Sequence, residues 1–392
     1  MTELRWIVGI ENAFIPDMGV DELTWTEHRQ RWREDLLLAR SVGASAVRYG
    51  ITWPELEPQP GRFEWQWCDQ VVDELSRLGL EPIWDMVHFG VPAWLEDGFL
   101  DEGFGPAFAR FCGAFARRYR GTVDKLTPLN EPYISTYFRA GWGIWPPHLR
   151  GRGGFVRLLH PIVEGIRSGV REIRAVNPDA EIWLNDGADT FHATAPELTD
   201  EAAQRTRERY AAFDLLLGLA VPGHETHEWL VQAGYPPSAL AEEPVAIDVV
   251  GLDYYPDTEH DLYLDGQGWP AIRKAERPFG VRRTLLEYAE RYRLPLFIAE
   301  SSHSGSDDER RDWIDYNLSE IAAARRDGAQ VIGYTWWPLF DHIDWNTLLQ
   351  ERNGYVCPAG LFHLRPTTAD RQETPAAAVF RERAGAGASE EV

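Results

Sequence analysis

The stretch TPLNEP, residues 127–132, decides the fold because it places a carboxylate directly after a buried strand. Residues 123–129 form a short, largely apolar run that predicts this strand. Pro132 has no backbone N–H and biases Glu131 away from the helical region, so we expect the strand to end on this acid. A second apolar run, residues 294–299, also ends on an acid, Glu300. Acids that end parallel strands of one barrel meet at one rim.

An apolar run followed by a helix-compatible stretch recurs along the whole chain. The expected strands are 6–10, 44–51, 81–88, 123–131, 180–185, 245–255, 295–300 and 329–337. The expected helices are 26–42, 67–78, 107–120, 156–176, 201–221, 283–292 and 309–326. Eight such units predict an α/β fold, a single (β/α)8 TIM barrel. A doubly wound open sheet is the rival fold, but residues 9–12 lack the glycine-rich turn that it requires.

The composition predicts one domain and narrows the range of partners. The 392 residues contain no Ser/Gly/Pro-rich linker, so we expect a barrel domain over residues 1–383 and a disordered tail over 384–392. A formal charge of −23 disfavours nucleic acid and anionic membranes, because it leaves no positive surface for them. No run of 18 apolar residues predicts a membrane span.

Four further features bear on location and on the binding of metals or phosphates. No secretory leader pattern is visible, which predicts a cytoplasmic protein, and the three cysteines lack disulfide or zinc spacing. The run HETHE, residues 224–228, has its histidines three apart, whereas zinc proteases use four, so we expect a solvated loop there. The run GRGG, residues 151–154, lacks the Lys-Ser/Thr of a phosphate-binding loop and predicts a flexible loop. We expect no metal and no cofactor.

The expected strand ends carry polar and aromatic side chains that form a consistent set. The set consists of Glu11, Asn12, Arg48, His88, Asn130, Glu131, Asn185, Asp186, residues 253–255, Glu300, Trp336 and Trp337. One such residue alone is as often a satisfied buried polar group or a helix cap as a functional one. Two acids that share a rim with Arg48, His88 and Tyr255 instead predict the pair of carboxylates that glycoside hydrolysis needs.

The chain also resembles glycoside hydrolase family 1, within the clan of (β/α)8 retaining glycosidases, and looks like a divergent, short, β-glucosidase-like member. Six segments carry the resemblance in the family's order. They are residues 51–61 (similar to Ser-Trp-Pro-Arg), 87–95 (His-Trp-Asp-Leu-Pro-x-Trp-Leu), 130–132 (Asn-Glu-Pro), 251–255 (Gly-x-Asn-Tyr-Tyr), 298–300 (Thr-Glu-Asn-Gly) and 337–345 (Trp-Ser-Leu-Leu-Asp-Asn-Phe-Glu-Trp).

The resemblance implies a retaining β-glycosidase that hydrolyses a terminal β-linked sugar by double displacement. Glu300 is then the nucleophile, held by Arg48 and Tyr255, and Glu131 is the acid/base. It further implies that Asn130 binds the sugar 2-hydroxyl. The other implied substrate-binding residues are Glu11 or Asn12 on the first strand, His88, Phe89, Trp337, Asp344 and Trp345. The implied partner is a small carbohydrate or glycoside; neither the sugar nor the oligomeric state follows from the sequence.

The departures from the family pattern bear on which sugar is bound and leave the expected catalytic residues in place. Phe89 replaces the family's tryptophan, Asp344 replaces a glutamate that grips outer hydroxyls, and Ser301 and Ser302 replace Asn-Gly after the nucleophile. No Ser-Lys-Tyr cluster resembles that of the phospho-sugar members, which disfavours a 6-phosphoglycoside. Two alternatives stay open, namely a transglycosylase on the same residues and a sugar-binding barrel with weakened catalysis.

Overall fold

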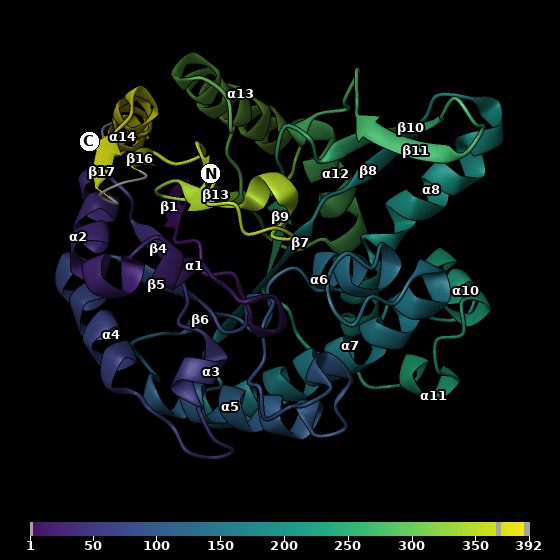
Figure 1. The fold of residues 1–392 in the computed structure, drawn as a ribbon, viewed down its shortest axis with the longest axis horizontal. Coiled ribbons are helices and arrows are strands. Elements are labelled where there is room, and N and C mark those ends of the chain that lie inside the picture. Colours follow the sequence, from purple (N-terminus) through teal and green to yellow (C-terminus); the bar gives the residue numbers. More distant parts are fainter. Residues whose placement is uncertain (1–2, 366–369, 388–392) are drawn as a thin grey trace.

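The computed structural model describes residues 3–365 and 370–387, and its centre is a closed parallel barrel (Figure 1). Its strands, in barrel order, are β1 (Arg5–Gly9), β4 (Ala46–Tyr49), β5 (Glu81–Asp85), β6 (Lys125–Thr127), β7 (Glu181–Gly187), β9 (Val249–Asp253), β12 (Leu296–Glu300) and β13 (Val331–Trp336), and β13 pairs with β1 to close the ring. Every neighbouring pair is parallel. The predicted TIM barrel is therefore confirmed.

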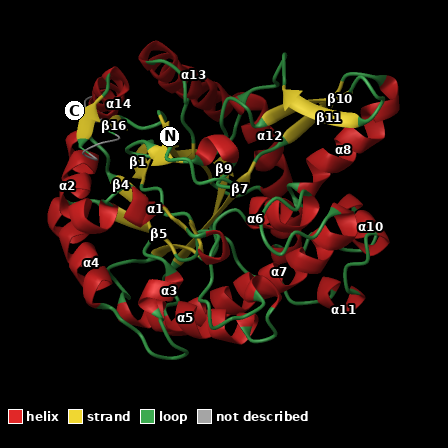
Figure 2. Cartoon of the chain, viewed as in Figure 1, coloured by secondary structure: helices red, strands yellow, loops and turns green. Residues whose placement is uncertain are grey.

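Helices surround the barrel, as Figure 2 shows in red around the yellow strands. The long ones are α2 (His28–Ser41), α4 (Gln66–Leu78), α5 (Phe104–Arg118), α7 (Gly151–Val176), α8 (Thr199–Glu208), α9 (Ala211–Leu216), α10 (Glu225–Gln232), α12 (Val281–Tyr292), α13 (Asp307–Arg326) and α14 (Pro375–Gly387). Single-turn helices are α1 (Glu22–Trp25), α3 (Trp53–Leu56), α6 (Pro132–Thr136) and α11 (Pro237–Leu240). The apolar faces of the helices pack on the outside of the strands and exclude water from that side of the sheet.

Alternate side chains of the strands fill the interior of the barrel. Ile7, Ile83, Trp183 and Phe297 belong to this inner cluster, and the last two rings meet edge to face with centroids 4.9 Å apart. Gly251 leaves room for them, because a Cβ atom at this position would lie 2.6 Å from Phe297 Cε1. The interior is thus a packed core, and the space for a ligand lies above it, at the carboxyl ends of the strands.

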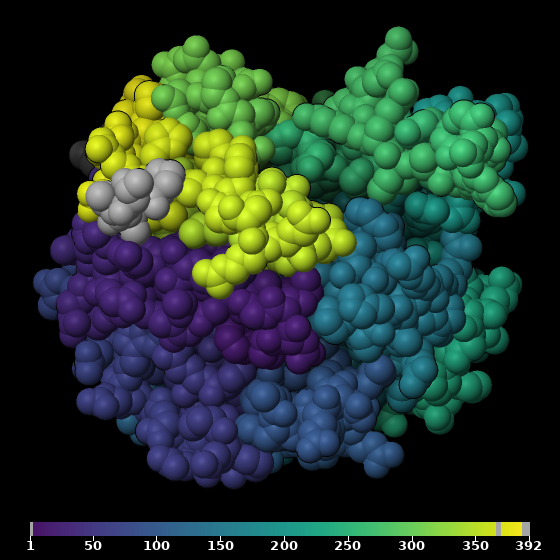
Figure 3. All heavy atoms as spheres, viewed as in Figure 1, coloured from purple at the N-terminus to yellow at the C-terminus, as the bar shows by residue number. Residues whose placement is uncertain are grey.

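Short strands extend the loops at this rim. They are β2 (Phe14–Ile15), β3 (Val20–Asp21), β8 (Thr190–Ala193), β10 (Glu259–Leu264), β11 (Pro270–Lys274), β14 (His342–Ile343), β15 (Val356–Cys357), β16 (Phe362–Leu364) and β17 (Arg371–Glu373). Strands β8, β10 and β11 form a separate sheet at the edge of the molecule, which the sequence reasoning missed (Figure 1). In Figure 3, yellow segments of the C-terminal part of the chain lie against the purple N-terminal part on the same face.

Three local predictions were wrong. Residues 151–154 form the first turn of α7 and not a loop, because the helix gains its stability from the buried face that follows, from Phe155 onward. Residues 225–228 begin α10, where Trp229 and Leu230 are buried and His224 accepts a hydrogen bond from the Thr226 amide. Helix α14 runs to Gly387, so the predicted start of the tail at residue 384 falls inside a helix; residues 388–392 lie outside the described part of the chain.

Candidate active site

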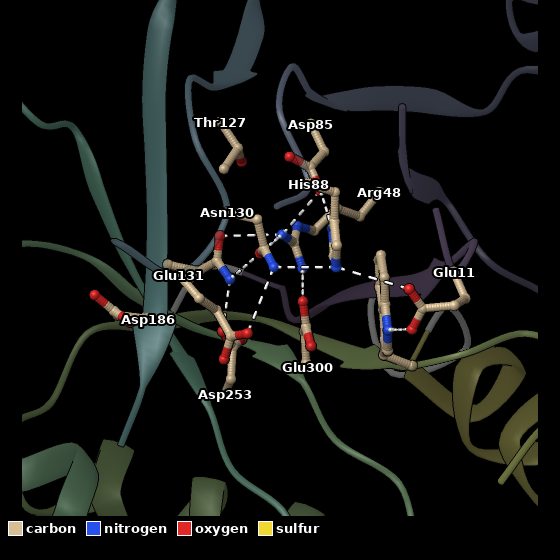
Figure 4. A network of polar contacts seen from close by, with 12 residues as sticks. Glu11, Arg48, Asp85, His88, Thr127, Asn130, Glu131, Asp186, Asp253 and Glu300 are labelled. Carbon is tan, nitrogen blue, oxygen red and sulfur yellow. Dashed lines mark hydrogen bonds and ion pairs between the residues drawn. The ribbon is translucent and has the colours of Figure 1, made fainter. Parts of the chain in front are cut away.

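Two glutamates lie next to each other at the rim of the barrel. Glu300 is the last residue of β12, whereas Glu131 lies beyond the end of β6 at Thr127. Glu131 has a φ of +46°, so the prediction that the strand continues to this acid was wrong, and the left-handed conformation of a non-glycine residue stores about 1–3 kcal/mol. One carboxylate oxygen of each glutamate and one of Asp253 all lie within 4.8 Å of one another (Figure 4).

Arg48 on β4 organises the site from below. Its guanidinium is fully buried and donates to Glu300 and to the side-chain oxygen of Asn130. It also donates to Asn185 Oδ1 at 3.1 Å and lies 3.4 Å from Asp85 Oδ2. Because a guanidinium has five donors in a rigid fork, one side chain holds groups from β5, from the segment after β6, from β7 and from β12 in fixed positions (Figure 4).

The two glutamates have different electrostatic surroundings. Burial raises the pKa of Glu300 above its ordinary value, and the charges of Arg48 and His88 limit this rise. The Tyr255 hydroxyl donates to Glu300 Oε2 at 2.9 Å. No ion pair with a basic side chain involves Glu131 among residues 3–365 and 370–387. Burial, followed by the charges of Asp253 and Glu300, raises the pKa of Glu131 well above its ordinary value. Glu131 therefore favours the protonated form, and Glu300 is the carboxylate that a cation supports.

A second polar cluster lies at the other end of the site, around Glu11. The Trp337 indole N–H donates to Glu11 Oε2 at 3.1 Å, and the Ala13 amide donates to Oε1 at 2.9 Å. His342 Nδ1 lies 3.5 Å from Oε2 and His88 Nε2 3.7 Å from Oε1. Although burial opposes it, the hydrogen bond from His342 and the histidine charges lower the pKa of Glu11 to about 2. Glu11 and His342 therefore form a buried ion pair.

His88 links the two clusters. Its Nδ1 lies 2.6 Å from Asp85 Oδ2, and its Nε2 lies 3.1 Å from the Asn130 side-chain nitrogen. Its ring stacks parallel to that of Trp337, with centroids 5.4 Å apart. Burial lowers the pKa of His88, but Asp85 more than compensates, so the net direction is upward. The two stacked rings and the Glu11 carboxylate form one wall of the site. This wall combines an aromatic surface with hydrogen-bonding groups, a composition that suits a sugar.

The cavity between these groups has a volume of about 420 Å³. Glu11, His88, Trp337 and His342 line one end, and Glu131 and Glu300 lie in its lining as well. The remaining lining includes an apolar set formed by Ile134, Tyr137, Phe138, Trp142, Phe191 and Ile272. A ligand in this cavity therefore meets polar groups at one end, carboxylates in the middle and rings at the other end.

The structure places most of the predicted site residues at this cavity. Those that line it are Glu11, His88, Phe89, Glu131, Tyr255, Glu300, Trp337 and Trp345, whereas Arg48 and Asn130 lie directly behind the lining. Asn12 is buried beside Gly50 and does not belong to the lining, so Glu11 is the first-strand residue that reaches the cavity.

Asp344 also departs from its predicted position. Its carboxylate accepts hydrogen bonds from the amides of Tyr355, at 2.8 Å, and Asn353, at 3.2 Å. The residue has a φ of +61° and is fully buried outside the cavity lining. Asp344 holds the loop that follows β14, because the loop amides satisfy its charge. Its contact with the sugar stays a prediction.

Sequence reasoning missed two polar residues of the site, Asp85 and His342. It also did not recognise that the carboxyl group of Asp253 belongs to the site. Asp85 ends β5, three residues before His88, and an acid and a histidine within the same expected strand, 81–88, were the available signal. His342 lies inside the quoted segment 337–345. Asp253 was recognised as a strand end, but nothing in the sequence shows that its carboxyl group lies beside both glutamates.

The three carboxylates also have the spacing of metal ligands. Glu131, Asp253 and Glu300 are the residues of the described chain that lie close enough to share an ion. Arg48 already supplies a positive charge to this group, and burial raises the pKa values of Glu131 and Asp253, which favours their uncharged forms. The expectation of a metal-free enzyme stays a prediction.

A parallel barrel with two buried carboxyl groups at its rim, one cation-supported and one protonated, defines the class of glycoside hydrolases. The model of the family named Glycosyl hydrolase family 1 matches residues 19–257 and 255–372. The chain therefore belongs to glycosyl hydrolase family 1.

Relatives and solved structures agree with this membership. β-Glucosidase A of Thermotoga maritima is 24% identical over 367 aligned residues, which cover 84% of this chain and 81% of the relative. The aryl-phospho-β-D-glucosidase BglC of Bacillus subtilis is 24% identical, again over 84% of this chain and 81% of the relative. In fold, the chain is similar to a β-glucosidase from Thermotoga maritima solved with a calystegine derivative, with a TM-score of 0.81, 19% identity and coverage of 98% of both chains. No helix within residues 3–365 and 370–387 has the length and apolar character of a membrane span.

Proposed function

We propose that the protein is a retaining β-glucosidase-like enzyme in which Glu300 is the nucleophile and Glu131 the acid/base. The observation that carries the proposal is the close approach of the two carboxyl groups, with oxygens within 4.8 Å. Double displacement uses carboxyl groups about 5–5.5 Å apart, whereas inversion needs about 6.5–9.5 Å to admit a water molecule.

The surroundings of each glutamate support its role. In the first step Glu131 donates its proton to the glycosidic oxygen, the C1–O bond breaks, and a Glu300 oxygen bonds to C1. Arg48 and Tyr255 keep Glu300 ionised and oriented before this attack. In the second step Glu131 takes a proton from water, which attacks C1 and releases Glu300. The hydrogen bonds to Asn130 Oδ1 from Arg48 and Asn185 orient the Asn130 amide. Its nitrogen lies 3.1 Å from His88 Nε2 and 3.5 Å from Glu131 Oε2, and we assign this nitrogen to the sugar 2-hydroxyl.

The polar end around Glu11 supports a neutral sugar as the glycone. Some relatives are named 6-phospho-β-glucosidases, such as the enzyme of Dickeya chrysanthemi, which is 23% identical. Glu11 keeps its negative charge at this end, because its pKa is lowered to about 2. This carboxylate opposes a phosphate group. We further place the enzyme in the cytoplasm, which the free state of Cys68, Cys112 and Cys357 supports.

The experiment that tests the proposal is incubation with 2-deoxy-2-fluoro-β-glucosyl fluoride, followed by intact mass and peptide mapping. We expect a mass gain of one fluorosugar on the peptide that carries Glu300. A label on another acid would refute the assignment of the nucleophile. If gluco, galacto, manno and fuco analogues all leave the protein unlabelled while it still binds the parent sugars, the chain is a sugar-binding barrel.

A further inference from the structure

A third carboxyl group, that of Asp253, lies between the two glutamates. Asp253 ends β9 and pairs in register with Glu300 on one side and with Gly187 on the other, so the sheet itself places it in the site. It is 1% exposed. The Asn185 amide donates to its Oδ2 at 2.6 Å, whereas its buried Oδ1 has no hydrogen-bond partner among the described residues. A carboxyl oxygen of Asp253 lies within 4.8 Å of one of Glu131.

Two carboxyl groups form a hydrogen bond only when one proton lies between them, because two carboxylates have acceptors and no donor. The charged and titratable groups that face this pair are Glu300, Asp186, Tyr255, Arg48 and His88. The Asp186 carboxyl group accepts from the amides of Tyr133, Ile134 and Gly187 and so remains an acceptor. The Arg48 guanidinium binds Glu300 directly, which leaves the pair without a cation of its own.

We propose that Asp253 shares one proton with Glu131 and acts as a positioning residue that keeps this proton on the general acid. The proposal rests on the proposed role of Glu131. When Glu131 protonates the leaving group, the proton moves to the glycosidic oxygen and two adjacent carboxylates remain. Their repulsion makes Glu131 a stronger base for the water molecule of the second step. Asp253 thus acts on both half-reactions without contact with the reacting atoms.

The test is the Asp253→Asn variant, in which the amide oxygen still accepts from Asn185 while the new N–H₂ group donates to an ionised Glu131. We expect the alkaline limb of the pH profile of kcat/KM to move to lower pH by about 1–2 units with 4-nitrophenyl β-glucoside and with alkyl β-glucosides. With 2,4-dinitrophenyl β-glucoside the leaving group needs no proton, so this limb should be absent in both proteins. Asp257→Asn removes one carboxylate from the same cavity lining and should leave the alkaline limb in place.

The outcomes separate this proposal from the proposed function. A shift in Asp253→Asn that depends on the leaving group supports proton sharing. An equal loss of kcat/KM with every leaving group at every pH would assign Asp253 a purely structural role and overturn the proposal. An unchanged alkaline limb in Asp253→Asn would also overturn it, and the function would stand if Glu131→Gln still abolishes that limb. If Glu131→Gln keeps the wild-type profile, the assignment of the acid/base itself is refuted.

Discussion

Replacement of Tyr255 by phenylalanine tests how the nucleophile is kept ionised. The variant keeps the ring and removes the hydroxyl that donates to Glu300 Oε2 at 2.9 Å. A hydrogen bond to a charged group contributes about 1.5–3 kcal/mol, and one pKa unit corresponds to about 1.36 kcal/mol. Since the hydroxyl stabilises the carboxylate form, we expect its loss to raise the pKa of Glu300 by about 1–2 units.

The assay is the pH profile of kcat/KM with an aryl β-glucoside, whose acid limb reports the nucleophile of the free enzyme. The acid limb should move to higher pH by the same 1–2 units or so, with kcat/KM falling by up to about 10–100-fold between the old and new pKa values. On the plateau above both pKa values the change should be small, because Arg48 still holds Glu300.

The neighbouring Tyr254 offers a matched control. Its hydroxyl donates to Glu259 Oε1 at 2.7 Å, outside the pair of glutamates, and the side chain is buried. Tyr254→Phe removes the same atom one residue away and should cost stability without moving the acid limb. An acid limb that stays in place in Tyr255→Phe, or that moves equally in both variants, would refute the reasoning.

Three further predictions concern the carboxyl groups of Glu300, Glu11 and Glu259. Glu300→Gly should abolish hydrolysis of an aryl β-glucoside, and added azide should restore turnover with the inverted glycosyl azide as the product; no rescue would contradict the role of Glu300. Burial lowers the pKa of His342, but Cys357 and, after it, Glu11 raise the pKa to about 10. Glu11→Gln removes the second of these two partners, so the pKa of His342 should fall below about 10, as NMR titration of the imidazole can show; an unchanged pKa would contradict the ion pair. Burial raises the pKa of Glu259, but hydrogen bonds, chiefly the one from His192, lower the pKa to about 2. The ionised Glu259 therefore stabilises the fold by about 3 kcal/mol above pH 4.5, and this contribution is lost as the pH falls toward 2. In Glu259→Gln the free energy of unfolding, measured by urea titration, should depend less on pH between 4.5 and 2. A pH dependence equal to that of the unmutated protein would contradict this account.

The barrel was predictable because each of its units is local. An apolar run of five or so residues followed by an amphipathic stretch needs no knowledge of distant partners, and the eight expected strands all pair in the barrel. The boundaries were less predictable. Strand β6 ends at Thr127 because the chain then turns through the left-handed residue Glu131 into α6, and no propensity argument assigns a non-glycine residue to that conformation.

The candidate site was predictable to the extent that it depends on strand ends. Glu131 and Glu300 were named from their positions after two apolar runs, and the barrel brings them together. The surrounding sheet of β8, β10 and β11 was missed, because strand β10 pairs with β8 across nearly seventy residues and the loops carry no turn signal that specifies this pairing. Helix α14 was missed because its alanine-rich sequence resembles a small-residue tail as well as a helix.

The sequence by itself determined the order of strands and helices, and with it which acids reach the rim, because periodicity and the place of each residue along a strand are properties of the chain alone. Only the tertiary structure decided what each acid does there. The Asp344 carboxylate accepts hydrogen bonds from the amides of its own loop, Glu11 is paired with His342, and Asp253 lies close to Glu131. Burial, charge and hydrogen-bond partners determine the protonation of a carboxyl group, and these come from residues that are far apart in the chain and meet only in the folded barrel.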